Sequence, residues 1–536
     1  MGRRAAPLGA RLTATWWHWA LLSCTLLGGV LRFAALEAKT LWLDEAFSLW
    51  MARHDLTSLL EWLVRIDHHP PLYYVLLHIW IDLHTWIGSV GDSPGALRSL
   101  SALTSTLAIP LYGMASRRLA GAHVGIVAAL LLTFAPFHVR YAQETRMYGL
   151  LTLAVALLFF ALAHVLVTDK VAEQRPRGWM WVLLAMAEAA AMLTHNTATI
   201  LVPLALNIAI GGLWLAQRRD CLTVRLPGVD QPKFLRLWLL SQLGALLFWL
   251  PWALPFVRQA QVVDSNFWIT PPNGGAVWTA LTNLTFAHLP ESLPFATSWA
   301  IVGVGLALWG IWRGGLRSAL TWLLVILWLL PPIVELLVSL RRPIFYDRTL
   351  IWTTLPYYLL IAQGLMAQGS IAQGIVPSKP LHMDWRSGWR LLYLVLYLVL
   401  CGLGLWNYYT TFAKEDWDKV AQHVAAQAQP NDLILFHASW IELPFAYYYP
   451  DNAPLLVRHG IPANLFDAGT LEPPMTEADI AHVHELISRE RGIWLVYSHW
   501  WYTDPEGLLL QVLGNELELV EQKEWPGIRV LHYVRP

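Results

Sequence analysis

Long apolar segments recur along this chain, and they limit what it can fold into more than any other feature of the sequence. A helix that crosses a bilayer needs about 20 apolar residues. Segments of this kind predict about eleven membrane-spanning helices, at residues 16–36, 98–117, 122–139, 148–168, 179–195, 197–216, 235–257, 297–312, 318–340, 347–367 and 389–407. Since backbone polar groups in lipid must be satisfied within the segment, we expect an α-helical polytopic membrane protein.

Composition agrees with this fold class and excludes others. Hydrophobic residues make up 56% of the 536 residues and charged residues only 14%, which is too apolar for an ordinary soluble enzyme. The net charge is zero, so no global field favours nucleic acid as a partner. The three cysteines, Cys24, Cys221 and Cys401, are too far apart for a metal-binding spacing or an evident disulfide framework.

The loops between the apolar segments indicate an orientation. Lys and Arg concentrate in alternate loops if the N-terminus is cytoplasmic and the apolar stretch 71–88 does not cross the membrane. If 71–88 did cross, every later loop would be inverted and the charge rule would fail. We therefore expect 71–88, which follows Pro70, to be a juxtamembrane helix in the first outer loop.

The composition changes after the last apolar segment. A helix-like stretch at 415–427 is followed by strand-like stretches at 432–437, 492–497, 516–521 and 528–534. Alternating helix and strand signals predict a small α/β domain. We therefore expect a transmembrane domain over 1–411 and an extracytoplasmic α/β domain over 412–536.

Two adjacent carboxylates, Asp44 and Glu45, lie directly after the first apolar segment and between apolar residues. Ionised side chains near hydrocarbon are costly and usually functional. Such a carboxylate can act as a general base or as a metal ligand. The alternative is that Asp44 caps the short helix that follows, because Asp is a favoured N-cap residue.

A second polar motif precedes the stretch 71–88 and contains Asp67, His68, His69 and, after two prolines, Tyr73. Imidazole and carboxylate groups together can hold a divalent metal ion or steer a phosphate. The alternative is a helix entry whose polar residues lie in the headgroup zone.

Several arginines fall on the outer side, against the charge pattern of the other loops: Arg140, Arg146, Arg341, Arg342 and Arg348. Binding a phosphate at the outer leaflet would explain them, with Tyr148 and Tyr346 as neighbouring hydroxyl groups. Alternatively, these arginines pair with the nearby acids Glu144, Glu335 or Asp347.

In this order, the motifs resemble those of the GT-C superfamily of polyprenyl-phosphate-dependent glycosyltransferases. The resemblance covers about the first 410 residues and is strongest to the bacterial branch related to protein O-mannosyltransferases and the lipid A aminoarabinose transferase. It rests on the Asp44-Glu45 pair, the motif from His69 to Tyr74, the turn from Gln143 to Tyr148, and the basic turn at Arg348.

The resemblance implies a bacterial-type inner-membrane enzyme of the cell envelope, with an extracytoplasmic site in the first outer loop. Asp44 would be the catalytic carboxylate of an inverting sugar transfer and Glu45 its supporting partner. The lipid phosphate and the sugar donor would contact His69, Tyr73, Arg146, Tyr148, Tyr346 and Arg348. Some relatives bind a divalent metal near the Pro-Pro pair, where this chain has Asp67, His68 and His69. The acceptor would be a protein, a glycolipid or a polysaccharide.

Two other classes of protein remain open from the sequence. A transporter or flippase of lipid-linked sugars would also have many spans, but it predicts inverted repeats and helices broken at matching positions, and the sequence has neither. A structural membrane subunit with a sensory outer domain would tolerate loss of Asp44. We therefore favour the glycosyltransferase.

Overall fold

The computed structural model describes residues 8–67, 69–167, 178–263, 269, 271–366, 388–470, 473–488 and 490–536. The chain divides into two compact units. Unit 1 comprises residues 1–34, 98–256 and 269–412, and unit 2 comprises residues 35–97, 257–268 and 413–536. The predicted transmembrane domain 1–411 and α/β domain 412–536 stay a prediction; by contacts, residues 35–97 group with residues 413–536.

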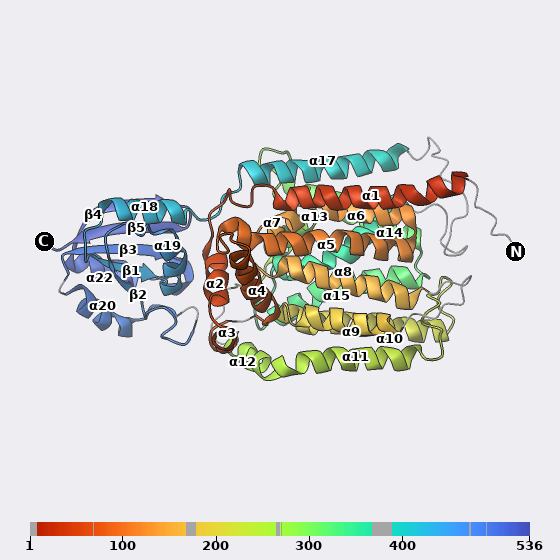
Figure 1. Cartoon of the computed structure of the whole chain (residues 1–536), viewed down its shortest axis with the longest axis horizontal. Helices are drawn as coiled ribbons and strands as arrows, with labels where there is room; N and C mark the ends of the chain where they lie inside the picture. The colour runs from red at the N-terminus through yellow and green to blue at the C-terminus, as the bar shows by residue number, and fades with distance from the viewer. Residues whose placement is uncertain are drawn as a thin grey trace. The chain divides into compact units, whose positions relative to one another are not determined.

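Unit 1 is a bundle of helices that run side by side (Figure 1). Its helices are α1 (Leu8–Phe33), α5 (Pro94–Ala120), α6 (Ala122–Phe134), α7 (Pro136–Ala142), α8 (Tyr148–Leu166), α9 (Trp179–Met192), α10 (Asn196–Arg218), α11 (Phe234–Trp249), α12 (Ala253–Val263), α13 (Gly274–Phe286), α14 (Ala300–Gly314), α15 (Ala319–Ser339), α16 (Thr354–Met366) and α17 (Gly388–Thr410), with 3₁₀ turns η1 (Leu250–Trp252), η2 (Ala296–Trp299) and η3 (Asp347–Thr353). The first turn of α5, residues 94–97, and most of α12, residues 257–263, belong to unit 2.

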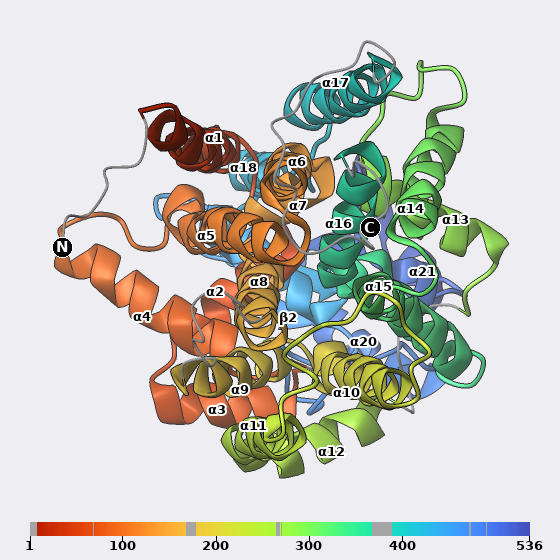
Figure 2. The ribbon, with the colours of Figure 1, turned by 90° about the vertical axis from the view of Figure 1, so that its right-hand side faces the viewer.

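The bundle has an inner and a lipid-type outer layer. Figure 2 views it nearly end-on, with α8 among α5, α6, α9 and α16 and with α11 and α17 at its rim. Of the 18 most apolar consecutive residues in α8, 78% are buried. In the helical segment Phe234–Gln261, which starts with α11, only 22% of such residues are buried. Leu239, Leu243 and Leu247 of α11 are exposed, as expected for side chains that face hydrocarbon.

The membrane-protein prediction is confirmed, and the number of spans stays a prediction. All eleven predicted segments are helical. Among the described residues, five helices are long and apolar enough to cross a membrane, or six if the bent pair α6–α7 is counted as one span. The others are shorter, such as the 14-residue α9, or less apolar, such as α5 with its two arginines in the last turn.

Polar side chains inside the bundle, among them Glu188 and Glu335, form hydrogen bonds with neighbouring segments. Gln242 of α11 donates to Glu188 of α9 at 2.7 Å, and Thr349 donates to Glu335 of α15 at 2.9 Å. Helix-to-helix hydrogen bonding of this kind is an ordinary way to satisfy polar groups in a membrane protein.

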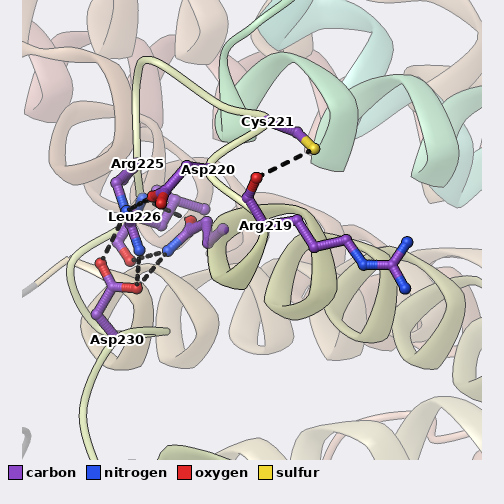
Figure 3. A network of polar contacts seen from close by, with 7 residues as sticks. Arg219, Asp220, Cys221, Arg225, Leu226 and Asp230 are labelled. Carbon is purple, nitrogen blue, oxygen red and sulfur yellow. Dashed lines mark hydrogen bonds and ion pairs between the residues drawn. The ribbon is translucent and has the colours of Figure 1, made fainter.

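The loop between α10 and α11 is held by ion pairs at its own base. Arg225 lies between Asp220 and Asp230 and donates to them at 2.9 and 2.8 Å (Figure 3). Gln217 also donates to Asp230, at 3.0 Å. Because these pairs are largely exposed, they fix the loop more than they stabilise the fold.

Unit 2 contains a five-stranded sheet and three helices from the first predicted outer loop. The three helices are α2 (Leu43–Ala52), α3 (Leu56–Arg65) and α4 (Leu72–Trp86). The strands are β1 (Leu433–His437), β2 (Val457–Gly460), β3 (Gly492–Ser498), β4 (Glu518–Trp525) and β5 (Ile528–Val534), in the order β2-β1-β3-β5-β4. The strands β2, β1 and β3 are parallel, and β5 and β4 continue the sheet antiparallel.

Helices cover both faces of this sheet, which confirms the predicted α/β fold. The helices α18 (Trp417–Gln427) and α19 (Glu442–Tyr448) lie on one face, and α20 (Ile480–Ile487) and α22 (Leu508–Glu516) lie on the other (Figure 1). Short turns η6 (Ser439–Ile441), η7 (Glu477–Asp479) and α21 (Trp500–Thr503) complete the unit. Alternate residues of β1 enter the two cores: Leu433 and Leu435 pack with α20 and α22, and Phe436 contacts Phe445 of α19.

Candidate functional site

The acidic pair lies in the first turn of α2 in unit 2. Asp44 is half-buried and Glu45 is fully buried. The N-cap of α2 is Trp42, which makes no side-chain cap bond, so the capping role considered for Asp44 does not apply. The Glu45 carboxylate accepts a hydrogen bond from the Lys414 ammonium at 2.8 Å, and Lys414 is itself almost fully buried.

The C-terminal part of the chain supplies further groups around this turn. The Glu415 carboxylate accepts from the backbone N–H of Leu43 at 3.4 Å and from Trp417 Nε1 at 2.6 Å. Burial raises the pKa of Glu415, and the negative charge of Asp44 acts in the same direction. His499 follows β3, and burial lowers its pKa to about 4 even though the charge of Asp44 favours the protonated ring.

An aromatic cluster joins α2 and α3 to the segment that follows β2. Phe466 has its ring centroid 6.0 Å from that of Phe47, 4.7 Å from that of Trp50 and 6.0 Å from that of Trp62. Tyr74 of α4 meets Phe47 edge-on at 6.5 Å. Aromatic packing of this kind fixes the helix that carries Asp44 against its neighbours.

The second polar motif is also in unit 2, and two of its side chains are brought together. His69 Nδ1 lies 2.9 Å from Asp67 Oδ1, and Gln259 Nε2 donates to the His69 carbonyl at 3.4 Å. Tyr73 is fully buried and packs edge-on against Tyr74. His68 lies outside the described residues.

The described residues contain no cluster of three or more His, Cys, Asp or Glu side chains arranged to hold a metal ion. The Asp67–His69 pair supplies two donors of the right chemistry, and a metal ion would need at least one more. A divalent ion at Asp67, His68 and His69 therefore stays a prediction.

In unit 1, three residues that were predicted to bind the lipid phosphate lie together: Tyr148, Tyr346 and Arg348. The Arg348 guanidinium carbon is 4.9 Å from the ring centroid of Tyr346 and 5.9 Å from that of Tyr148. Tyr148 begins α8, and Arg348 is the second residue of η3. Asn283 of α13 donates to Asp347 at 2.6 Å, and Asp347 accepts from the Arg348 N–H at 2.7 Å, so the turn that bears Arg348 is bonded to α13.

The other arginines that the sequence placed on the outer side have different surroundings. Arg146 is buried just before Tyr148, and its carbonyl accepts from Ser101 Oγ at 3.1 Å. Arg140 pairs with Glu144 at 3.3 Å, as the alternative explanation from the sequence allowed. Arg341 and Arg342 are exposed. A phosphate site at these residues stays a prediction.

Sequence reasoning missed Lys414, Glu415 and His499 as neighbours of the acidic pair. The available signal for the first two was a short charged run, residues 414–416, that begins seven residues after the last apolar segment. Nothing local indicated His499, because its place near Asp44 depends on how the sheet of unit 2 is assembled.

The helical bundle of unit 1 and the short helices and α/β sheet of unit 2 form a fold that is shared with solved structures. No protein-family model matches the sequence, and no curated protein matches it. Solved structures do match over nearly the whole chain.

Two of the similar structures are of ArnT from Cupriavidus metallidurans. The apo form matches with a TM-score of 0.59 at 17% sequence identity, over 97% of this chain and 98% of the other. The form bound to undecaprenyl phosphate matches with a TM-score of 0.57 at 16% identity over the same shares. An oligosaccharyltransferase from Archaeoglobus fulgidus, tethered to an acceptor peptide, matches with a TM-score of 0.54 at 11% identity, over 97% of this chain and 74% of the other. At these identities, the similarity establishes the fold.

Proposed function

We propose that this protein is a membrane glycosyltransferase that moves a sugar from a polyprenyl-phosphate donor to an acceptor. The observation that carries the proposal is the end-to-end match to ArnT, a protein solved with undecaprenyl phosphate bound. The Archaeoglobus oligosaccharyltransferase has been solved with a dolichol-phosphate and an inhibitory peptide. A lipid-phosphate ligand is thus common to solved proteins of this fold.

In the proposed reaction, Asp44 is the general base. It takes the proton from the acceptor hydroxyl or amine as the acceptor atom bonds to the anomeric carbon of the sugar. The bond from that carbon to the phosphate oxygen breaks, and the lipid phosphate leaves with the bonding electrons, which inverts the configuration. Asp44 suits this role because it is half-buried on a fixed helix, whereas Glu45 is ion-paired with Lys414.

Arg348, Tyr148 and Tyr346 are proposed to bind the lipid phosphate, with Arg146 as a further cation. A guanidinium near the leaving phosphate stabilises its negative charge as the glycosidic bond breaks. The position of the Arg348 guanidinium over the rings of Tyr346 and Tyr148 supports this role, because it brings the cation and both tyrosines together. His69 and Tyr73 are proposed to line the donor site from α4 and its entry.

We further propose a bacterial-type plasma-membrane location with a cytoplasmic N-terminus and the sheet of unit 2 on the extracytoplasmic side. The alternating Lys and Arg content of the loops supports this orientation. The acceptor is proposed to be a protein, a glycolipid or a polysaccharide. No observation favours the transporter alternative.

The test is transfer of labelled sugar from a polyprenyl-phosphate donor by the purified protein, with mass spectrometry of the products from a panel of acceptors. Asp44→Asn should lower turnover by about 10²- to 10⁴-fold, the usual contribution of a general base. Asp82→Asn is the matched control, because Asp82 is an exposed carboxylate on α4. Full activity of Asp44→Asn would refute the catalytic role of Asp44.

A further inference from the structure

The ion pair between Glu45 and Lys414 is the most deeply buried one in the described part of unit 2. The exposed fractions of the two side chains are 0% and 3%, and the atoms Oε2 and Nζ are 2.8 Å apart. A buried ion pair is weak evidence for added stability, because desolvation offsets much of the attraction. Removing one partner, however, leaves an uncompensated charge and forces the other side chain to move or lose its charge.

Glu415, which follows Lys414, and Tyr448 bind the segment that leads into α2. The Glu415 carboxylate accepts from the N–H of Leu43, and the Glu415 carbonyl accepts from Thr40 Oγ1 at 2.6 Å. Tyr448 of α19 accepts from the N–H of Leu41 at 2.7 Å. The segment from Thr40 to Glu45 is thus held by side chains and backbone that lie about 400 residues later in the sequence.

These contacts matter for Asp44 because of helix geometry. Consecutive residues of a helix are rotated by about 100°, so a buried Glu45 and a half-buried Asp44 point in different directions from one rigid turn. Trp42 provides no side-chain cap that would fix this turn from within α2. A shift of the Glu45 side chain would therefore be transmitted to Asp44.

We propose that Lys414 is a positioning residue, which orients the catalytic carboxylate of Asp44 by anchoring Glu45. This inference rests on the proposed function of Asp44. Lys414 contacts neither the donor nor the acceptor in this role. It fixes the first turn of α2, and it keeps Glu45 engaged so that Asp44 alone is presented to the acceptor.

The experiment compares five variants of the full-length protein in sugar transfer: Lys414→Met, Lys414→Arg, Glu45→Gln, Glu45→Gln with Lys414→Met, and Lys419→Met. Lys419 is the matched control, because it forms an exposed ion pair with Asp416 in the same segment. Lys414→Met should lower kcat by about 10- to 100-fold, the size expected from a displacement of about 1 Å. The KM for the donor should change by less than about twofold, because the donor contacts are intact.

Two comparisons separate positioning from a general structural effect. Lys414→Arg keeps the charge and should retain most of the activity. The double variant removes both charges and should be at least about threefold more active than Lys414→Met alone, because no unpaired carboxylate remains in the buried turn. A kcat unchanged in Lys414→Met, or a double variant no better than Lys414→Met, would overturn the proposal.

Thermal unfolding of the same variants distinguishes this inference from the proposed function. The wild-type protein could transfer no sugar while the Tm changes of the Glu45 and Lys414 variants are strongly non-additive. In that case the proposed function fails, and the ion pair between Glu45 and Lys414 is supported. If the wild-type protein is active and Lys414→Met does not fold, the Lys414→Arg and double variants still decide the positioning role. Retained activity in both supports it, and loss in both overturns it.

Discussion

The side chain of Gln143 donates to the carbonyl of Arg32, and both side chains bind backbone carbonyls at the ends of helices in the bundle. The Arg32 guanidinium donates to the carbonyls of Leu132 and Thr133, at 2.9 and 3.2 Å, where α6 ends. The Gln143 amide donates to the carbonyls of Arg32 and Ala34, at 3.2 and 2.7 Å, where α1 ends. Arg32 thus satisfies carbonyls at the end of α6, and Gln143 satisfies carbonyls at the end of α1, in a region where water is scarce.

The first prediction concerns the hydrogen bonds of Gln143. Gln143→Leu removes the donor and leaves the terminal carbonyls of α1 unsatisfied, so we expect a loss of about 1–3 kcal/mol in unfolding free energy. The measurement is thermal unfolding in detergent. Gln427→Leu is the control, since Gln427 makes only an exposed bond to Glu521 among the described contacts. Equal Tm values for the two variants would contradict the prediction.

A second prediction addresses the proposed phosphate site. Arg348→Ala should raise the KM for the polyprenyl-phosphate donor by about tenfold or more, since one charge-assisted contact is worth about 1.5–3 kcal/mol. Arg348→Lys should restore only part of this loss, because lysine lacks the planar fork that stacks on Tyr346 and Tyr148.

The control for the phosphate site is Arg341→Ala. Arg341 is an exposed arginine of the same cationic turn. Steady-state kinetics with varied donor concentration would decide the matter. An Arg348→Ala variant with the same donor KM as Arg341→Ala would rule out a phosphate contact at Arg348.

A third prediction is a pH dependence of stability in unit 2. Burial lowers the pKa of His437 to about 4, although the charge of Asp504 acts the other way. The ring contacts the Ile461 carbonyl at 3.1 Å and Thr503 Oγ1 at 3.0 Å. Because the folded pKa lies below the unfolded value of about 6.5, the stabilisation is present above pH 6.5 and is lost as the pH falls towards 4.

Because the folded protein resists protonation of His437, acidification should cost the wild-type protein stability that a variant without this imidazole does not lose. Unfolding followed by tryptophan fluorescence between pH 7 and pH 4.5 should therefore show a smaller decline in His437→Gln than in the wild-type protein. His482→Gln, at an exposed position of α20, should decline as the wild type does. If stability declines with pH equally in His437→Gln and His482→Gln, the pH dependence does not come from His437.

The fourth prediction concerns a metal ion at Asp67, His68 and His69. If these residues bind a divalent ion, native mass spectrometry should find about one ion per chain, and His69→Ala should lose it. His482→Ala is the control histidine. A metal-free wild-type protein that is fully active after chelation would end the metal hypothesis.

Much of the fold could be predicted because its causes are local. The apolar segments of unit 1 are helical where the sequence indicated, and β5 has the predicted bounds Ile528–Val534. The short strand β2 was missed, because four residues with Arg458 and His459 among them carry no apolar alternation. Its place at the edge of the sheet is fixed by pairing with β1, which no local pattern reveals.

The candidate site was only partly predictable for the same reason. Asp44 and Arg348 were noticed because charge is rare in such surroundings, and that signal is present in the sequence. The partner of Glu45 was not, since Lys414 lies 369 residues away and is one lysine among 37 basic residues. Sequence reasoning assigned no role to Thr349, whose hydroxyl donates to Glu335 in the structure.

The sequence separation of Glu45 and Lys414 also has a consequence for the synthesis of the protein. A ribosome adds about 5–20 residues per second, so Lys414 is made roughly 20 to 70 s after Glu45. Throughout that interval, the acidic turn exists without the ammonium group that anchors it in the finished molecule. Under the proposed roles, the nascent chain would be a membrane protein long before it is an enzyme, and a chain truncated before its last domain would stay inactive.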